Sequence, residues 1–100
     1  MPTSDFLEVD PRSLHLPPSS FSGADPYKYH RQVVTHGNSV VGMPPLVVYR
    51  GTDGGLVIAD GVTRATRVAR RLPGRLITVE VIGTWRAAVG GYPTIGDRIP

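Results

Sequence analysis

One short segment of the sequence combines residue types that together bind phosphate. It runs from Asp60 to Arg64, reads Asp-Gly-Val-Thr-Arg, and directly follows the apolar run at 56–59. The run is typical of a strand, and the apolar residues after Gly61 recur at helical spacing, which predicts a strand that passes at once into a helix. The first turn of a helix carries unpaired N–H groups and the positive end of the helix dipole, and both favour a bound phosphate.

The side chains of this junction support the same interpretation. Gly61 has no Cβ to keep a ligand from the backbone, Thr63 has a hydroxyl to donate, and Arg64 can donate charge-assisted hydrogen bonds to phosphate oxygens. Asp60, at the strand end, is a candidate catalytic residue and a candidate ligand for a divalent cation, magnesium or manganese. A common Asp-Gly turn, an N-cap and a solvated arginine explain the same residues without a ligand, so that alternative stays open.

Further candidates come from neighbouring segments. His36 is a candidate catalytic base near the end of an expected helix, although a capping or surface histidine fits the same position. Arg31, on that helix, and Arg67, one turn after Arg64, are candidate additional phosphate contacts, with a solvated face as the alternative. Three tyrosines are candidates to stack on a nucleotide base or, equally, to pack in the core: Tyr27, Tyr29 and Tyr49.

Turn residues and apolar spacing predict the elements that position these side chains. Asp25 followed by Pro26 begins a helix, and Gly37 ends it. Strands are expected at 46–50, 56–59 and 76–82, with a hairpin between the first two, and a second helix is expected at 62–72. A strand–helix–strand unit favours parallel pairing and the hairpin adds an antiparallel pair. We therefore expect an α+β domain with a small mixed sheet and two main helices.

The remaining segments flank this unit. Residues 1–23 are rich in proline and serine and are expected to form an extended lead-in with a short strand at 6–9. The domain itself is expected over 24–83. Residues 84–100 are rich in glycine and proline and are expected to form a tail that packs on the domain through Trp85. The lead-in is expected to attach through three apolar residues: Leu14, Leu16 and Phe21.

Composition limits the classes of function. One hundred residues suit one domain, and the lack of cysteine excludes disulfides and thiolate metal sites. The net charge is +3, and ten of the eleven basic residues are arginine, which favours a nucleotide, nucleic-acid or acidic partner but equally reflects a GC-rich genome. No apolar run of about 18 residues exists and the N-terminus lacks signal-peptide features. We expect a soluble protein, cytoplasmic or delivered into a target cell, with no membrane partner.

From residue 27 to residue 83, the order of these parts resembles the ParB/sulfiredoxin superfamily. The matching parts are 31–37, 45–50, 54–59, 60–69 and 76–81. The resemblance implies the fold of that family and assigns binding of nucleotide phosphates to Gly61 and Arg64. Val62 and Thr63 stand where sulfiredoxin has Cys-His and where CTP-binding partition proteins have Glu and Arg. We expect no sulfinic-acid reduction, because there is no cysteine, and no DNA-binding helix-turn-helix like that of a partition protein.

The helix start Asp-Gly-Val-Thr-Arg-Ala-Thr-Arg is similar to that of ParB-like domains of bacterial polymorphic toxins. This similarity implies a phosphate-handling enzyme, a nuclease or nucleotide hydrolase acting as a toxin effector, with a cognate immunity protein as partner. The second hypothesis is a non-catalytic module that binds a nucleotide or nucleic acid in the same place. The lack of a clear second carboxylate near Asp60 favours the second hypothesis, since Glu80 is the one acidic residue of the closing strand.

Overall fold

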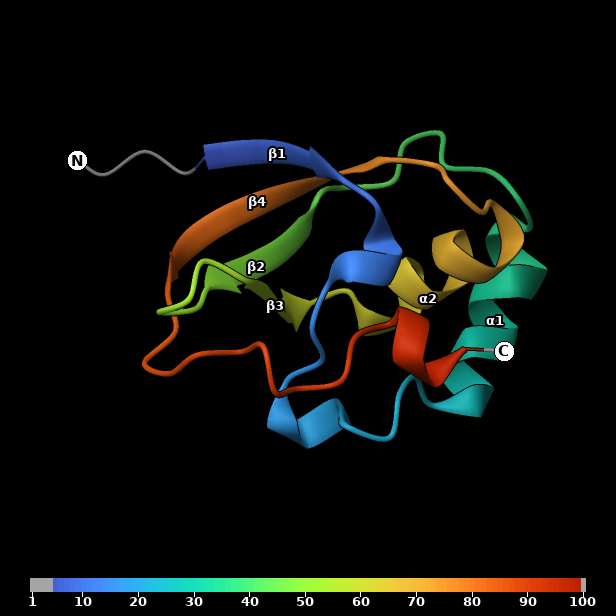
Figure 1. The fold of residues 1–100 in the computed structure, drawn as a ribbon. Helices are drawn as coiled ribbons and strands as arrows, with labels where there is room; N and C mark the ends of the chain where they lie inside the picture. The colour runs from blue at the N-terminus through green and yellow to red at the C-terminus, as the bar shows by residue number, and fades with distance from the viewer. Residues whose placement is uncertain (1–4, 100) are drawn as a thin grey trace.

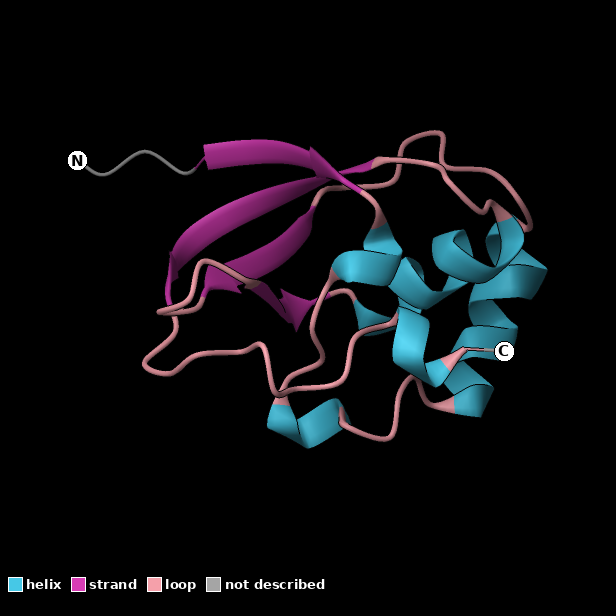
Figure 2. Cartoon of the chain, viewed as in Figure 1, coloured by secondary structure: helices cyan, strands magenta, loops and turns pink. Residues whose placement is uncertain are grey.

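A four-stranded sheet with helices on one side forms the framework of the computed structural model, which describes residues 5–99 (Figures 1 and 2). The strands are β1 (Asp5–Val9), β2 (Leu46–Arg50), β3 (Leu56–Asp60) and β4 (Ile77–Thr84). The helices are α1 (Pro26–His36) and α2 (Val62–Arg71), and short 3-10 turns lie at Pro11–Ser13, Pro18–Ser20 and Gly96–Arg98. The expected small α+β domain with a mixed sheet is confirmed.

The order of the strands in the sheet is β1-β4-β2-β3. β1 pairs antiparallel with β4, the β2–β3 hairpin is antiparallel, and β2 pairs parallel with β4. The expected parallel pairing within the strand–helix–strand unit is wrong, because β4 returns beside β2 and not beside β3. The outer edge of β3 is instead covered by the lead-in, where the His15 N–H donates to the Leu56 carbonyl at 2.9 Å and the His15 carbonyl accepts from the Ile58 N–H at 3.0 Å.

Helix α2 is the helix that joins the core. Its residues 65–69 are all buried, and its apolar members pack in one cluster with the inward side chains of β2, β3 and β4. Helix α1 packs against α2 but has no fully buried residue, and its Val34 is 71% exposed. Helix α2 ends one residue before the expected Leu72, and β4 runs two residues further than expected.

The two flanking segments contribute to the same core. Leu14 and Leu16 from the lead-in and Ile95 from the tail are buried together with the sheet and α2. Trp85, the expected tail anchor, is half-buried, whereas Val89 is fully buried against the β2–β3 turn. The tail is therefore held by its aliphatic residues more than by its tryptophan. Among the described residues, neither helix is long and apolar enough to cross a membrane.

Candidate functional site

A cleft of about 820 Å³ lies beside the junction between β3 and α2. Its walls are most of the loop over 17–26, the Lys28 and Gln32 side chains of α1, and the junction over 59–64. The cleft thus brings together a segment from the lead-in and the segment that carries the candidate phosphate site. Four of the predicted site residues line it: Asp60, Gly61, Thr63 and Arg64.

Helix α2 begins in the wall of this cleft without a side-chain cap. Gly61 is its N-cap residue, no side chain within residues 5–99 accepts from its first N–H groups, and no acidic residue stands in its first turn. Helix α1 differs, because the Asp25 carboxylate accepts from the N–H groups of Tyr27 and Lys28 at 2.8 and 3.3 Å. The N–H groups at the start of α2 are therefore the ones left to bind a ligand in the cleft.

Gly61 is required by the local backbone independently of any ligand. Its φ of +116° lies in the left-handed region that side chains rarely adopt. A Cβ at this position would also stand 2.6 Å from Cγ of Leu46, a residue fixed in the core. The positive φ of Gly61 turns the chain sharply, so that β3 passes directly into α2 beside the cleft.

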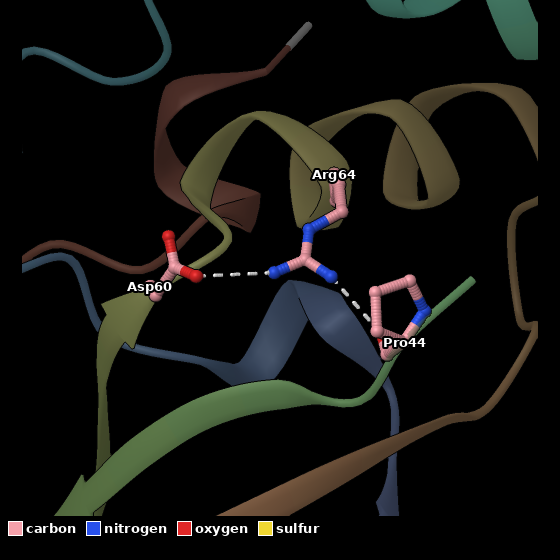
Figure 3. A network of polar contacts seen from close by, with 3 residues as sticks. All are labelled: Pro44, Asp60 and Arg64. Carbon is pink, nitrogen blue, oxygen red and sulfur yellow. Dashed lines mark hydrogen bonds and ion pairs between the residues drawn. The ribbon is translucent and has the colours of Figure 1, made fainter.

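Arg64 is held in place at the edge of the cleft, between the loop before β2 and the end of β3 (Figure 3). Its Nη1 donates to the Pro44 carbonyl at 3.0 Å, and its Nη2 lies 3.5 Å from Oδ2 of Asp60. The Arg64 side chain is 17% exposed and that of Asp60 is 79% exposed. At that separation and exposure the ion pair contributes little to stability. It is therefore a pair that a ligand can displace.

The formal charges around the cleft balance. Lys28 and Arg64 are cationic, and Asp25 and Asp60 are anionic. Long-range attraction of an anion into the cleft is therefore weak, and the local N–H groups of α2 must supply most of the binding. Asp60 opposes an anionic ligand unless a cation lies between them.

His36 and Arg31 lie outside the cleft. His36 is the exposed last residue of α1 and lines a small cavity of about 80 Å³ between the two helices and the loop before β2. Arg31 borders a neighbouring groove of about 330 Å³ and lies over the Tyr27 ring at 6.0 Å. The groove shares Lys28, Gln32 and Thr63 with the cleft, and the cavity at His36 shares Gln32 and Arg64 with it, so both residues border the predicted site without lining the cleft itself.

Arg67 has a structural role, and the expectation of a solvated face is wrong for it. The residue is 1% exposed, and its Nη1 donates to the carbonyls of Gly37 and Ser39 at 2.9 and 2.8 Å. Burial, and less strongly the positive charge of Arg71, lowers the pKa of the Arg67 guanidinium below its ordinary value. The negative end of the α1 dipole partly offsets the cost of burying this charge. Arg67 therefore ties α2 to the end of α1.

Sequence reasoning missed part of the cleft. The serines of the loop, Ser19, Ser20 and Ser22, line it together with Lys28. Gln32 lines it too, and its Oε1 is buried without a hydrogen-bond partner among residues 5–99. The sequence shows that these serines and Gln32 carry polar groups able to bind a ligand. Their approach to the β3–α2 junction depends on Leu14 and Leu16 entering the core, which local patterns do not predict.

The cleft has one carboxylate that is open to a metal ion. Asp60 is exposed, whereas the Asp25 carboxylate is used to cap α1. No group of three or more His, Cys, Asp or Glu side chains suitable for a metal ion occurs within residues 5–99. The comparison with protein-family models and the comparison with curated proteins both found no match for the sequence. Functional assignment therefore depends on the geometry of the cleft.

Proposed function

We propose that this chain is a ParB-like phosphate-binding domain whose cleft receives a phosphate group of a nucleotide or nucleic acid. The observation that carries the proposal is the uncapped start of α2, which lies in the wall of the cleft beside Arg64. The N–H groups of the first turn, the Thr63 hydroxyl and the Arg64 guanidinium would share the phosphate oxygens. The family assignment is supported by the order of helix, hairpin, helix and strand over residues 26–84.

A hydrolytic activity is the second candidate, as a nuclease or nucleotide hydrolase and in that case a toxin effector with an immunity protein as partner. The exposed Asp60 carboxylate at the cleft favours it. Magnesium commonly binds through one or two carboxylates together with substrate phosphates, and a single Asp60 fits that pattern. Such an ion would offset the repulsion between Asp60 and the phosphate and would make a bound water more acidic.

Replacement of Arg64 by alanine tests the binding proposal. We expect Arg64→Ala to weaken binding of pyrophosphate and nucleoside triphosphates by about 1.5–3 kcal/mol, the scale of a hydrogen bond to a charged group. This corresponds to about 10- to 150-fold in the dissociation constant. Isothermal titration calorimetry without metal gives the constants, and the melting temperature of the free protein checks folding.

Arg71→Ala is the matched control. Arg71 lies on the same helix, two turns after Arg64, and its Nε donates to Asn38 Oδ1 at 2.6 Å, away from the cleft. We expect this variant to bind phosphate ligands like the wild type. If Arg71→Ala weakens binding as much as Arg64→Ala does, the ligand lies along the flank of α2 and not at its start. No binding of any phosphate compound by the folded wild type would reject the proposal.

A further inference from the structure

We propose that the outer edge of β1 is a docking site for an extended segment of another protein that alternates basic and apolar residues. Such a segment adds a strand to the sheet and pairs with β1 through main-chain hydrogen bonds. The order of the strands puts β1 at the opposite edge of the sheet from β3 and the phosphate cleft, so the proposal does not depend on the proposed function. It follows from the backbone of β1, from its exposed apolar side chains and from its charge.

The backbone of β1 is open along its outer edge, where it forms the outermost strand of the sheet (Figures 1 and 2). All five residues of β1 pair with β4, without a bulge. In an antiparallel pair alternate residues turn their N–H and C=O groups toward the partner, so the other residues of β1 turn theirs outward. No strand, bridge or loop within residues 5–99 forms hydrogen bonds with these outward groups. The opposite edge of the sheet differs, because the lead-in covers β3 through His15.

The side chains of β1 do not protect this edge from another strand. Natural sheets commonly guard an open edge with a lysine, a proline or a bulge, and β1 has none of these. Leu7 and Val9 pack at the margin of the core and are only partly buried. Phe6 points to the other face of the sheet and is 59% exposed. An added strand with apolar residues opposite Phe6 and Leu7 removes part of this apolar surface from water.

The charge of this edge selects a basic partner. Strands β1 and β4 together carry three acidic residues, Asp5, Glu8 and Glu80, and no basic residue, although the net charge of the chain is +3. None of the three forms an ion pair within residues 5–99, and Arg75, which borders a small cavity with Glu8, lies beyond ion-pair distance of it. The Thr78 hydroxyl donates to Oε1 of Glu8 at 2.6 Å and holds that carboxylate on the open face. A basic side chain opposite Asp5 or Glu8 therefore gains a favourable cross-strand charge pair.

A second copy of this chain complements the edge less well than a basic strand does. When two β1 strands pair antiparallel along their whole length, Leu7 stands opposite Leu7 of the copy, Phe6 opposite Glu8, and Asp5 opposite Val9. Each carboxylate then faces an apolar side chain, and the carboxylates of both copies gather along one seam without a basic residue of β1 between them. We therefore assign the edge to a basic segment of another protein, and self-association is an outcome of the test.

A synthetic peptide built to the register of β1 tests the proposal. The probe reads Val-Lys-Val-Ile-Lys with acetylated and amidated ends, so that in an antiparallel pair its lysines stand opposite Glu8 and Asp5 and its isoleucine opposite Phe6. The control peptide has glutamate in place of both lysines. Fluorescence anisotropy of the labelled peptides gives the dissociation constants. We expect the basic peptide to bind with a constant below about 1 mM and the acidic peptide to bind about tenfold or more weakly. No binding of the basic peptide at about 1 mM, or equal binding of both peptides, would overturn the proposal.

Methylation of the peptide backbone distinguishes strand addition from a loose contact between charges. A strand turns the N–H groups of alternate residues to one side, so N-methyl groups on the first, third and fifth residues block one side of the peptide, and those on the second and fourth block the other. We expect one of these two peptides to lose about tenfold or more in affinity and the other to bind within about threefold of the unmodified peptide. Two methylated peptides that bind alike, whether tightly or weakly, would show that β1 does not pair with the peptide.

Reversal of one charge on β1 places the peptide at this edge. We expect Glu8→Lys to weaken the basic peptide about fivefold and to strengthen the acidic peptide by a similar factor. Asp60→Lys makes the same change of charge on β3, at the opposite edge of the sheet, and is the control that changes neither affinity. Melting temperatures check that both variants fold. Equal effects of the two variants would mean that the peptide responds to net charge and not to β1. Sedimentation of the wild type completes the test, and a dimer that the basic peptide fails to dissociate would assign the edge to a second copy and overturn the proposal.

Discussion

At the scale of single residues, Asp60 and Arg64 have opposite effects on a phosphate in the cleft. Arg64 attracts it, while the exposed Asp60 carboxylate repels it and competes for the same guanidinium at 3.5 Å. A pure binding module gains nothing from a carboxylate at this position. An enzyme does, because it needs a group that acts on the attacking water or holds a metal ion. The two candidate functions therefore differ in what the loss of Asp60 does.

Replacement of Asp60 by asparagine separates the two functions. We expect metal-free nucleotide affinity to hold or to rise by up to about 1 kcal/mol, the scale of an exposed charge pair. If the protein is a hydrolase, turnover falls by about 100-fold or more, as when a general base is lost. Hydrolysis of nucleotides and nucleic acids is measured with magnesium or manganese and again with a chelator.

Asp25→Asn is the matched control for this experiment. It removes a carboxylate from the same cleft, and asparagine still caps α1, since it is as good an N-cap as aspartate. We expect any turnover to survive it. Wild-type turnover that persists in Asp60→Asn and in the chelator would mean that Asp60 has no part in the chemistry. His36, whose cavity shares Arg64 with the cleft, would then be the next residue to test.

The residues of the β3–α2 junction could be predicted because their signals are local. An Asp-Gly step between a strand and a helix predicts the passage from β3 into α2, whereas the positive φ of Gly61 was seen only in the structure. Arg67 could not be predicted in the same way. Its spacing from Arg64 and Arg71 is that of a charged helix face, and only the position of the loop after α1 makes it a buried residue.

At the scale of elements, the ends of the helices were predictable and the arrangement of the strands was not. Asp25, Pro26 and Gly37 bound α1 where their chemistry predicts. The position of β4 beside β2 depends on which sheet edge is free. The lead-in covers the edge of β3 through His15, which leaves the edge of β2 for the returning strand. Such competition between distant segments has no local signal in the sequence.

Arg67→Met tests the contact between the two helices. The substitution keeps much of the apolar packing but removes the donors to the Gly37 and Ser39 carbonyls. We expect the free energy of unfolding to fall by about 1.5–3 kcal/mol, as for lost hydrogen bonds to a charged group. Urea denaturation at neutral pH gives the value. Arg71→Met, at an exposed site of α2, should cost less than about 1 kcal/mol. Equal costs for both variants would contradict the structural role of Arg67.

At the scale of the whole molecule, the flanking segments make the fold and the cleft possible. Leu14, Leu16 and Ile95 complete the core, and the loop over 17–26 forms one wall of the cleft. A domain of 100 residues buries a limited apolar surface, so it benefits from these contributions. Their sequences are short and rich in proline, serine and glycine, and they lack the periodicity that predicts burial. For this reason the sequence predicts the wall of the cleft that the β3–α2 junction forms, but not the wall that the loop over 17–26 forms.

One carboxylate in the β2–β3 turn helps to fasten the tail to the sheet, at the place where the two segments lie side by side (Figure 1). Asp53 Oδ1 accepts from the Gly55 and Val89 N–H groups, both at 3.2 Å, and Oδ2 accepts from the Gly90 N–H at 2.9 Å. These bonds favour the ionised form. The bond from Val89, followed by those from Gly90 and Gly55, lowers the pKa of Asp53 below its ordinary value of 3.8, although desolvation partly opposes the shift.

Because the pKa of Asp53 is lower in the folded protein, the unfolded chain takes up this proton first as the pH falls. The stability that Asp53 contributes is therefore complete above the ordinary pKa of 3.8 and declines as the pH falls through that value toward the folded pKa. We expect Asp53→Asn to be less stable than the wild type at neutral pH, since the asparagine amide carries no charge and has only one acceptor oxygen. The difference in the free energy of unfolding between the two proteins should narrow below about pH 4. Urea denaturation of both proteins between about pH 7 and about pH 2.5 measures this difference, and every other group titrates in both, so the comparison isolates Asp53. A difference that stays constant or widens in acid would show that this carboxylate does not fasten the tail through its charge.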